Sequence, residues 1–267
     1  MELSIVILNY QMKRLVRNCL RSLYEQNLPF SFEVIVVDNH SEADIADFIH
    51  EEFPSVRVIA SSRNGGMGAG NNIGIKAALG KYVLVLNPDI FVLPESIDKL
   101  YGYLERHRGV ALVAPRLLNP DRSLQYTCYR WHSFLMPLYR RTRLGQWPRI
   151  KSRVDHFLMK DFDHELTREV PWCQGSCFAA RREVLDQIGH FDEKFFMYFE
   201  DTDLCRRIWA TGHKVVYHGE AVMIHVHMKA SEGGFSQILT NRLTRAHITS
   251  WLRYLWKYRR ARNRDIM

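Results

Sequence analysis

The sequence has no apolar run long enough to cross a membrane. Its longest apolar runs, such as 82–86 and 110–114, are as long as strands and far short of the roughly 20 residues that a membrane-spanning helix needs. The first residues also lack the basic stretch and the small-residue cleavage site of a secretory signal. We therefore expect a cytoplasmic protein without a transmembrane helix.

Cysteine is scarce and shows no pairing pattern. The chain has five cysteines among 267 residues, and their spacing fits neither a disulfide framework nor a paired Cys-x-x-Cys zinc site. Cys173 and Cys177 alone provide too few ligands for structural zinc, which takes four. The sequence therefore predicts reduced thiols, most of them buried.

The glycine-rich segment 65–74 lacks a complete dinucleotide-binding motif. Asn71 and Ile73 occupy the positions where G-x-G-x-x-G requires its last glycine, and the segment follows the third predicted strand instead of the first. A helix that begins with such small residues can still approach a phosphate or a sugar closely. The segment therefore argues against a dinucleotide site but leaves a nucleotide site open.

Short β-branched runs alternate with helical stretches through the first half of the chain. Hydrophobic residues make up 46% of the sequence, enough to bury a continuous core. The alternation predicts an α/β fold with a Rossmann-like, mostly parallel sheet flanked by helices. The predicted strands are 3–8, 33–37, 56–60, 82–86 and 110–114, and the predicted helices are 12–26, 45–53, 67–79 and one that begins at Glu95.

This alternation ends after Pro115. Residues 116–170 contain aromatic and basic clusters without a clear period, which predicts a lid, a long loop or an acceptor-facing insertion. Beyond them the pattern predicts strands at 170–180 and 214–218 and helices at 181–188 and 200–210. Because no repeat or linker is visible, we expect one domain, 1–234, with halves 1–115 and 116–234, and a tail, 235–267.

Polar residues follow four of the predicted strands, at 9–10, 38–41, 64–66 and 87–89. In an open parallel sheet, ligands bind beyond the carboxyl ends of the strands. Each polar group taken alone is equally typical of a turn or a helix cap. Capping does not require that all four lie on the same edge of one sheet, so the four together favour a ligand site.

Five segments, in this order along the chain, resemble the inverting glycosyltransferases of family 2, which use nucleotide sugars and have the GT-A fold. The likeness is greatest to bacterial rhamnosyltransferase-like members and covers most of the chain, roughly 3–227. The segments are V-I-L-N-Y at 6–10, V-V-D-N-H-S at 36–41, N-G-G-M-G-A-G-N-N-I-G at 64–74, L-N-P-D at 86–89, and F-D-E at 191–193 with F-E-D-T-D-L at 199–204.

The resemblance implies a nucleotide-sugar site built mainly by the first half of the chain. Asp38 is expected to read a pyrimidine base, and the segment that begins at Asn64 is expected to line the nucleotide. The implied nucleotide-sugar-binding residues are Asn9, Tyr10, Asp38, Asn64, Gly66, Asn72, Asn87 and Asp89.

The resemblance also implies a divalent metal ion, Mg²⁺ or Mn²⁺. Asn87-Pro88-Asp89 stands where the family has Asp-x-Asp, and the carboxylate of Asp89 suits a hard cation that neutralises a departing diphosphate. Asn87 departs from the family pattern and adds no charge, so we expect weak metal binding. A histidine after the last core strand often completes the family's metal site; His227 is preferred for its spacing to Ser231, and His225 is the alternative.

The pair Glu200-Asp201 matches the family's catalytic carboxylates, which implies that Asp201 is the general base. Such a base removes the proton of the acceptor hydroxyl as it attacks the anomeric carbon. Alternatively, Glu200, Asp201 and Asp203 simply place negative charge in the first turn of a helix. The implied walls around the acceptor and the donor sugar contain Trp172, Gly175, Glu200 and Asp203, although Trp172 is equally typical of a core residue.

The last part of the chain is strongly basic. From Arg242 onward there are eight Lys or Arg residues and one acid, a net charge of +7 out of +8 for the whole chain. Ile248, Trp251, Leu252 and Leu255 recur at helical spacing, which predicts a basic amphipathic helix that binds an anionic membrane surface. A helix that only packs against the protein is the alternative, and no motif favours nucleic acid.

These observations together predict an inverting glycosyltransferase on the cytoplasmic face of the inner membrane. The expected donor is dTDP-rhamnose or otherwise a UDP-sugar, and the expected acceptor is a hydroxyl of a glycan or of a lipid-linked glycan. The alternatives are a sugar nucleotidyltransferase, although 9–12 is not its glycine-rich loop, and a non-catalytic protein that binds nucleotide sugars or serves as a membrane scaffold.

Overall fold

The computed structural model describes residues 1–41, 45–226 and 242–260. Its strands are β1 (Leu3–Asn9), β2 (Phe32–Asp38), β3 (Arg57–Ala60), β4 (Tyr82–Leu86), β5 (Ile90–Val92), β6 (Val110–Leu118), β7 (Cys128–Tyr129), β8 (Arg168–Glu169), β9 (Trp172–Cys173), β10 (Cys177–Arg181) and β11 (Lys214–His225). The main sheet has the order β3-β2-β1-β4-β10-β6-β11-β5, and β8 pairs with β11. The first four strands of this order are parallel, whereas β10 runs antiparallel to both of its neighbours.

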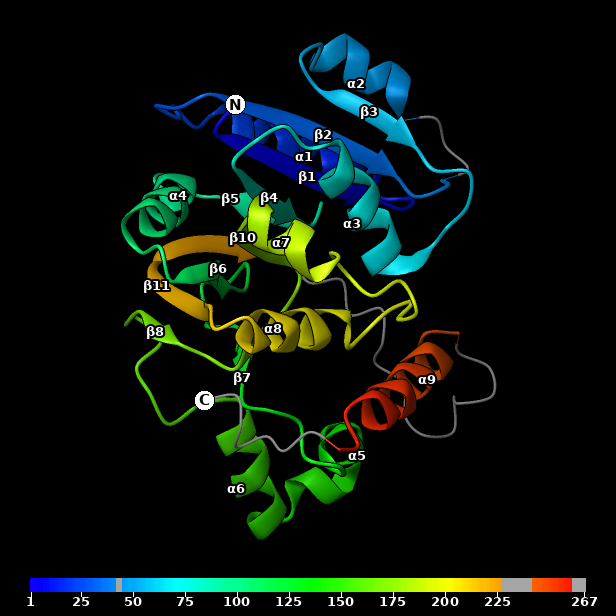
Figure 1. Cartoon of the computed structure of the whole chain (residues 1–267), viewed down its shortest axis with the longest axis vertical. Helices are drawn as coiled ribbons and strands as arrows, with labels where there is room; N and C mark the ends of the chain where they lie inside the picture. The colour runs from blue at the N-terminus through cyan, green and yellow to red at the C-terminus, as the bar shows by residue number, and fades with distance from the viewer. Residues whose placement is uncertain (42–44, 227–241, 261–267) are drawn as a thin grey trace.

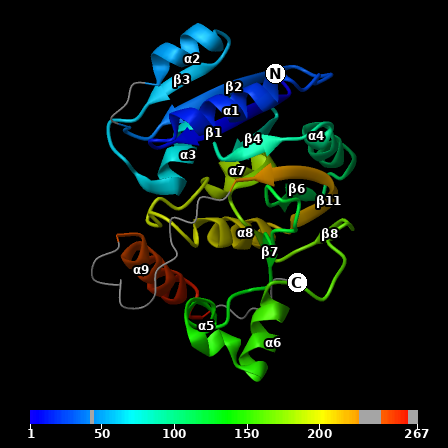
Figure 2. The same ribbon diagram turned by 180° about the vertical axis from the view of Figure 1, so that it is seen from behind.

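Helices cover both faces of the sheet, as Figures 1 and 2 show from opposite sides. The core on one face contains residues of α1, α2 and α4, and the core on the other face contains residues of α3, α7 and α8. The helices are α1 (Lys13–Tyr24), α2 (Ala46–Glu52), α3 (Gly66–Ala77), α4 (Ser96–Arg106), α5 (Met136–Arg141), the 3₁₀ turn η1 (Arg143–Gln146), α6 (Pro148–Phe157), α7 (Arg182–Ile188), α8 (Glu200–Ala210) and α9 (Arg242–Lys257).

The strands are buried on both faces. In β1, Ile5 and Ile7 join the core on the α1 side, and Val6 and Leu8 join the core on the α3 side. Successive side chains of a strand point to opposite faces, so a strand that is apolar throughout needs helices on both sides. The apolar run of β1 therefore requires the layered α/β fold that the sequence predicts.

The second half differs from the prediction in three places. The expected strand 170–180 is two strands, because the chain turns at 174–176 between β9, which pairs with β7, and β10, which enters the main sheet. The last strand does not stop at residue 218 but continues to His225 as β11. The insertion expected after Pro115 begins only beyond β6, which spans that residue, so both predicted halves of the domain share one sheet.

Helix α9 packs against the protein with one face. Its buried Tyr254 lies with Phe195 and Phe199, and Trp251 lies 5.7 Å from Phe134, measured between ring centroids. Figures 1 and 2 both place α9 beside α5, at the end of the molecule away from β3. The packing helix that the sequence left as an alternative is therefore present, although Leu252 and Trp256 remain exposed.

None of the helices in the described ranges is long and apolar enough to span a bilayer, in agreement with the sequence. All five cysteines are free and buried, as expected.

Candidate active site

The carboxyl ends of β1 and β2 carry a preformed polar pair. Asn9 and Asp38 are direct neighbours in the parallel register of the two strands. Asn9 Nδ2 donates to Asp38 Oδ1 (2.7 Å) and to Ser41 Oγ (2.9 Å), and the backbone N–H of Ser41 donates to Asp38 Oδ2 (3.2 Å). These bonds fix the carboxylate of Asp38 at the rim of the sheet. Tyr10 follows at the same rim with an exposed ring.

Asn39 connects this rim to the start of α3. Its Nδ2 donates to Asn64 Oδ1 (3.0 Å) and to the carbonyl of Gly66 (3.2 Å), and its Oδ1 accepts from the N–H of Gly65 (3.1 Å). The sequence noted Asn39 at the strand end but did not select it as a site residue. The sequence signal that could have identified Asn39 was its position next to Asp38, because successive residues of a strand point to opposite sides.

Two residues predicted to bind the nucleotide also have structural roles. The side chain of Asn72 donates to the carbonyl of Phe191 and to Glu193 Oε1 (both 2.9 Å) and accepts from the N–H of Phe191 (3.0 Å), so it connects α3 to the segment before α8. Gly66 has a φ of +89°, and a Cβ there would lie 1.9 Å from the carbonyl oxygen of Phe196. Glycine is therefore required at position 66 by the close approach of residue 196.

The turn after β4 brings Asp89 next to His225. The N–H of Ile90 donates to the carbonyl of Asn87 (3.1 Å), which closes the turn, and β5 then pairs with β11 so that Ile90 lies opposite His225. In this register Asp89 Oδ2 and His225 Nε2 are 3.2 Å apart, and both side chains are almost fully buried. His225, the alternative histidine, is thus the partner of Asp89, whereas His227 lies outside the described residues.

Hydrogen bonds around Gln125 determine that Nδ1 of His225 is a donor. Gln125 Nε2 donates to Asn119 Oδ1 (2.7 Å) and to the carbonyl of His225 (2.8 Å), which leaves Gln125 Oε1 to accept from His225 Nδ1 at 2.9 Å. Nε2, the other ring nitrogen, then faces the carboxylate of Asp89. A hydrogen bond of this kind, on the ring nitrogen away from the metal, is the type that orients metal-binding histidines.

The pair Asp89–His225 fits a divalent cation. Asp89 Oδ1 and Asn87 Oδ1 are buried oxygens with no hydrogen-bond partner among the described residues, so both are available as ligands or as acceptors from metal-bound water. Within the described ranges no group of three His, Cys, Asp or Glu side chains could hold a metal ion by itself. Water and substrate phosphates commonly complete the coordination of Mg²⁺ beside one or two carboxylates.

Asp201, the second residue of α8, has both carboxylate oxygens held by backbone groups. The N–H of Gly175 donates to Asp201 Oδ2 (3.1 Å), and the N–H of Thr202 donates to Oδ1 (2.7 Å). The residues just before the helix, Tyr198 and Phe199, have φ near +70°, a left-handed conformation that is uncommon for aromatic residues. Such strained backbone clusters at functional sites, and here it precedes the predicted base directly.

Glu200 and Asp201 have raised pKa values. Burial raises the pKa of Asp201, although the N–H groups of Gly175 and Thr202 act in the opposite direction. Burial, and next the charge of Asp201, raise the pKa of Glu200 well above the usual carboxyl range, and Glu200 Oε2 has no hydrogen-bond partner among the described residues. Buried carboxyls with raised pKa values are the type of group that serves as a general base near neutral pH.

The turns that carry Asp89 and Asp201 touch each other. Antiparallel β10 begins where β4 ends, with Cys177 opposite Leu86. The N–H of Asn87 donates to the carbonyl of Ser176 (2.8 Å), and the neighbouring Gly175 binds Asp201. The same rim continues through β1 to Asp38 on β2. Asp38, Asp89 and Asp201 therefore lie along one edge of the sheet.

Two residues predicted to face the acceptor or the donor sugar are buried among protein groups. Asp203 is fully buried, and its oxygens bind Arg207 Nε (2.8 Å), Lys257 Nζ (2.6 Å) and the hydroxyl of Tyr258 (2.7 Å), so it has a structural role. Trp172 is a core residue, the alternative reading of the sequence: it stacks on Tyr129, and its Nε1 donates to the carbonyl of Arg130.

A family model described as "Glycosyl transferase family 2" matches residues 4–189. The low-salt glycan biosynthesis hexosyltransferase Agl10 of Haloferax volcanii is 30% identical over 217 residues, 77% of this chain and 61% of that protein. The N-acetylglucosaminyl-diphospho-decaprenol L-rhamnosyltransferase of Mycobacterium tuberculosis is 30% identical over 204 residues, 72% of this chain and 66% of that protein. The alignments thus span less than two thirds of these relatives' length.

Solved structures with little sequence identity have the same fold. The mannosyltransferase PcManGT from Pyrobaculum calidifontis, in complex with GDP-Man and Mn²⁺, has a TM-score of 0.61 at 17% identity over 86% of this chain and 58% of that one. GalNAc-T7 with UDP, GalNAc and Mn²⁺ has a TM-score of 0.69 at 15% identity over 96% of this chain and 48% of that one. The family match ends before α8, so the roles of Asp201 and His225 depend on the geometry described above.

Proposed function

Because the chain belongs to glycosyl transferase family 2, we propose that it transfers a sugar from a nucleotide diphosphate to a hydroxyl of a glycan acceptor, with inversion and with Asp201 as the base. The family and the GT-A-like fold agree with the sequence prediction. The proposal depends most on one observation: the partly buried carboxylate of Asp201 is bound by the N–H of Gly175, beside the turn that carries Asp89.

In this mechanism the chain's own residues position both substrates. Asp38 binds the nucleotide base, held in place by Asn9 and Ser41. Asp201 accepts the proton of the acceptor hydroxyl as the oxygen attacks the anomeric carbon, and the nucleotide diphosphate leaves from the opposite face. The low solvent exposure of Glu200, next to Asp201, limits competing hydrolysis by water.

A divalent cation, Mg²⁺ or Mn²⁺, would be held by Asp89 and His225, with Asn87 beside them. When bound, the cation neutralises the negative charge that develops on the departing diphosphate. Two observations support this: His225 Nε2 lies 3.2 Å from Asp89 Oδ2, and the related folds named above were solved with Mn²⁺.

The donor that we propose is dTDP-rhamnose, or otherwise a UDP-sugar. The similarity to a mycobacterial L-rhamnosyltransferase supports a rhamnose donor. That relative is named for a lipid-linked acceptor, N-acetylglucosaminyl-diphospho-decaprenol, which supports a lipid-linked glycan as the acceptor of this chain.

A thermal-shift series tests donor and metal together. A ligand that binds only the folded state at 100 times its Kd stabilises that state by about 2.7 kcal/mol, which for a chain of this size raises Tm by roughly 5–10 °C. We expect this rise with one nucleotide sugar in Mn²⁺ and a much smaller rise in EDTA. Asp89→Ala should remove the effect of Mn²⁺, whereas Asp155→Ala, which breaks a surface ion pair with Lys160, should keep it. A rise that is equal with and without metal in both variants would contradict the metal assignment.

We also propose that the protein binds an anionic membrane surface through α9 and the neighbouring insertion. Leu252 and Trp256 on α9 and Phe134 and Trp147 in the insertion are all more than half exposed. Arginines accompany both segments, and α9 lies beside α5 in both views. Exposed aromatic and aliphatic side chains among arginines are typical of helices that lie in the interface of an anionic bilayer.

Vesicle co-sedimentation tests the membrane proposal. We expect binding to vesicles that contain phosphatidylglycerol and little binding to pure phosphatidylcholine. Replacing Leu252 and Trp256 together by serine should weaken vesicle binding roughly 10–100-fold, because both side chains lose their burial in lipid. Leu79→Ser is the matched control, since Leu79 is equally exposed but lies at the end of α3. Undiminished binding of the double variant would refute this role of α9.

A further inference from the structure

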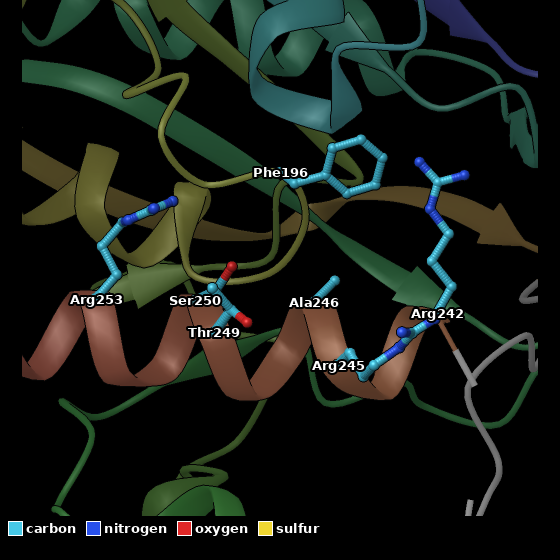
Figure 3. Close-up of a pocket in the computed structure, with 7 residues that line it drawn as sticks. All are labelled: Phe196, Arg242, Arg245, Ala246, Thr249, Ser250 and Arg253. Carbon is cyan, nitrogen blue, oxygen red and sulfur yellow. The ribbon is translucent and has the colours of Figure 1, made fainter. Parts of the chain in front are cut away.

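A cavity of about 390 Å³ lies between Phe196 and one face of α9 (Figure 3). Its volume is within the range of small-molecule sites, roughly 300–1,000 Å³. Its α9 residues recur at three and four positions, which places them on one stripe of the helix. They are Arg242, Arg245, Ala246, Thr249, Ser250 and Arg253.

The cavity has three arginines that are not neutralised by any acid in the described part of the chain. Arg242, Arg245 and Arg253 form no ion pair with any carboxylate in the described part of the chain. By contrast, Lys257 on the same helix is paired with Asp192 and Asp203. Uncompensated guanidinium groups around one cavity attract a multivalent anion, and their forked geometry suits phosphate oxygens.

The arrangement of the side chains suits an anion held against the helix. Arg242 and Arg253 extend from the two ends of the stripe on the side where Phe196 lies, and Ala246 and Thr249 lie between them (Figure 3). The guanidinium of Arg242 is 5.3 Å from the centroid of the Phe196 ring, which holds it at the cavity wall. The small side chain of Ala246 leaves room, and the Thr249 hydroxyl can donate a hydrogen bond.

The cavity adjoins the segment that leads into the predicted base. Ser250 Oγ donates to the carbonyl of Met197 (2.9 Å), and the carbonyl of Phe196 accepts from the N–H of Met67 at the start of α3 (2.9 Å). The same segment continues directly into Glu200 and Asp201. An acceptor whose hydroxyl reaches Asp201 can therefore extend along this segment toward α9.

The diphosphate of the donor already has a different site. Asp89 and His225, the proposed cation ligands, lie on the turn after β4 and at the end of β11, not on α9. The arginine-rich insertion is a weaker candidate for an acceptor phosphate, because its Arg130 is paired with Asp161 through two hydrogen bonds of 2.9 and 2.8 Å. The three arginines of α9 have no such partner in the described ranges.

We propose that this cavity binds the phosphate or diphosphate group of a lipid-linked acceptor, an inference that rests on the transferase function proposed above. Arg242 and Arg245, near the start of α9, would hold the charged group, while the attached sugar lies along 196–199 with its hydroxyl toward Asp201, and Arg253 would continue the basic wall of the cavity along the helix. Helix α9 would then position the acceptor as well as contact the membrane.

Isothermal titration calorimetry without metal tests the cavity with three probes: farnesyl diphosphate, inorganic pyrophosphate and farnesol. Wild type should bind both diphosphates, and farnesol much more weakly. The double variant Arg242→Gln/Arg253→Gln should bind both diphosphates at least roughly tenfold more weakly, since each charge-assisted hydrogen bond contributes about 1.5–3 kcal/mol. Arg259→Gln is the matched control, because Arg259 follows the same helix but lies outside the cavity.

A parallel titration with a nucleotide sugar and Mn²⁺ separates the possible failures. Unchanged affinity for the nucleotide sugar in the double variant supports an acceptor site, whereas a matching loss would assign the cavity to the donor and overturn the proposal. Three other results would also overturn the proposal. They are undiminished diphosphate binding by the double variant, binding of pyrophosphate but not of farnesyl diphosphate by wild type, and a loss by the double variant of binding to phosphatidylglycerol vesicles alone. If wild type binds no nucleotide sugar, the proposed transferase function fails, and the metal-free titrations still decide what the cavity binds.

Discussion

Replacing Asp201 by asparagine should slow sugar transfer by roughly 10²–10⁴-fold while the affinity for the nucleotide sugar stays within a few fold. Asparagine has nearly the same shape and can still accept a hydrogen bond from Gly175 or Thr202, but it cannot take a proton from the acceptor hydroxyl. The measurement is single-turnover transfer with radiolabelled donor, accompanied by calorimetric titration of the donor.

The pH dependence of transfer gives an independent check on the same residue. A base must be deprotonated to act, and burial raises the pKa of Asp201. The rate should therefore fall as pH decreases through this raised pKa, at a higher pH than an ordinary, exposed aspartate would give. Asp201→Asn should remove this acid limb from its residual activity.

Asp186→Asn is the control for this experiment, because Asp186 lies exposed on α7 and pairs only with Arg182 and His190. Full transfer activity in Asp201→Asn would favour a different base. If wild type binds the nucleotide sugar but shows no turnover at all, the non-catalytic binding protein considered from the sequence becomes the better explanation.

Asp203→Asn should destabilise the folded protein by about 3 kcal/mol, the order expected when one partner of a buried ion pair is removed. The fully buried carboxylate of Asp203 binds Arg207, Lys257 and the hydroxyl of Tyr258. An amide cannot accept from all three, and its NH₂ group would face a cationic donor. For a chain of this size the loss corresponds to a fall in Tm of roughly 6–12 °C.

Asp186→Asn is again the matched control. Asp203–Arg207 and Arg182–Asp186 are both helical pairs four positions apart, but only the second is exposed, and exposed pairs contribute roughly 0–1 kcal/mol. Urea unfolding of the two variants at pH 7 measures the difference directly. Similar unfolding midpoints for both would show that Asp203 does not hold α9 in place.

The sequence predicted the residues that follow strands better than the residues that lie on helices. Asn9 and Asp38 were identified because the carboxyl ends of parallel strands must meet at one edge, and the structure joins them with a hydrogen bond of 2.7 Å. The structural contacts of Asn72 were not foreseen, because its partner, Phe191, lies 119 positions away in the chain. Helical spacing shows which residues share a face, but not what that face meets.

His225 and Asp203 illustrate the same limit. Spacing along the chain favoured His227, whereas the pairing of β5 with β11 places His225 beside Asp89. The short strand β5 was not predicted, so this register was not available from the sequence. Asp203 resembled a sugar ligand by its position in the motif, and only the packing of α9 shows that its oxygens bind Lys257 and Tyr258.

The position of antiparallel β10 between β4 and β6 has a consequence for how this protein can be divided. β10 supplies the second neighbour of β4, so a piece that ended at residue 115 would leave β4 with a bare hydrogen-bonding edge and a strong tendency to associate with other strands. The halves 1–115 and 116–234 therefore cannot be exchanged as separate modules between related enzymes. A change of donor preference in this protein has to come from side chains at the rim, within an undivided sheet.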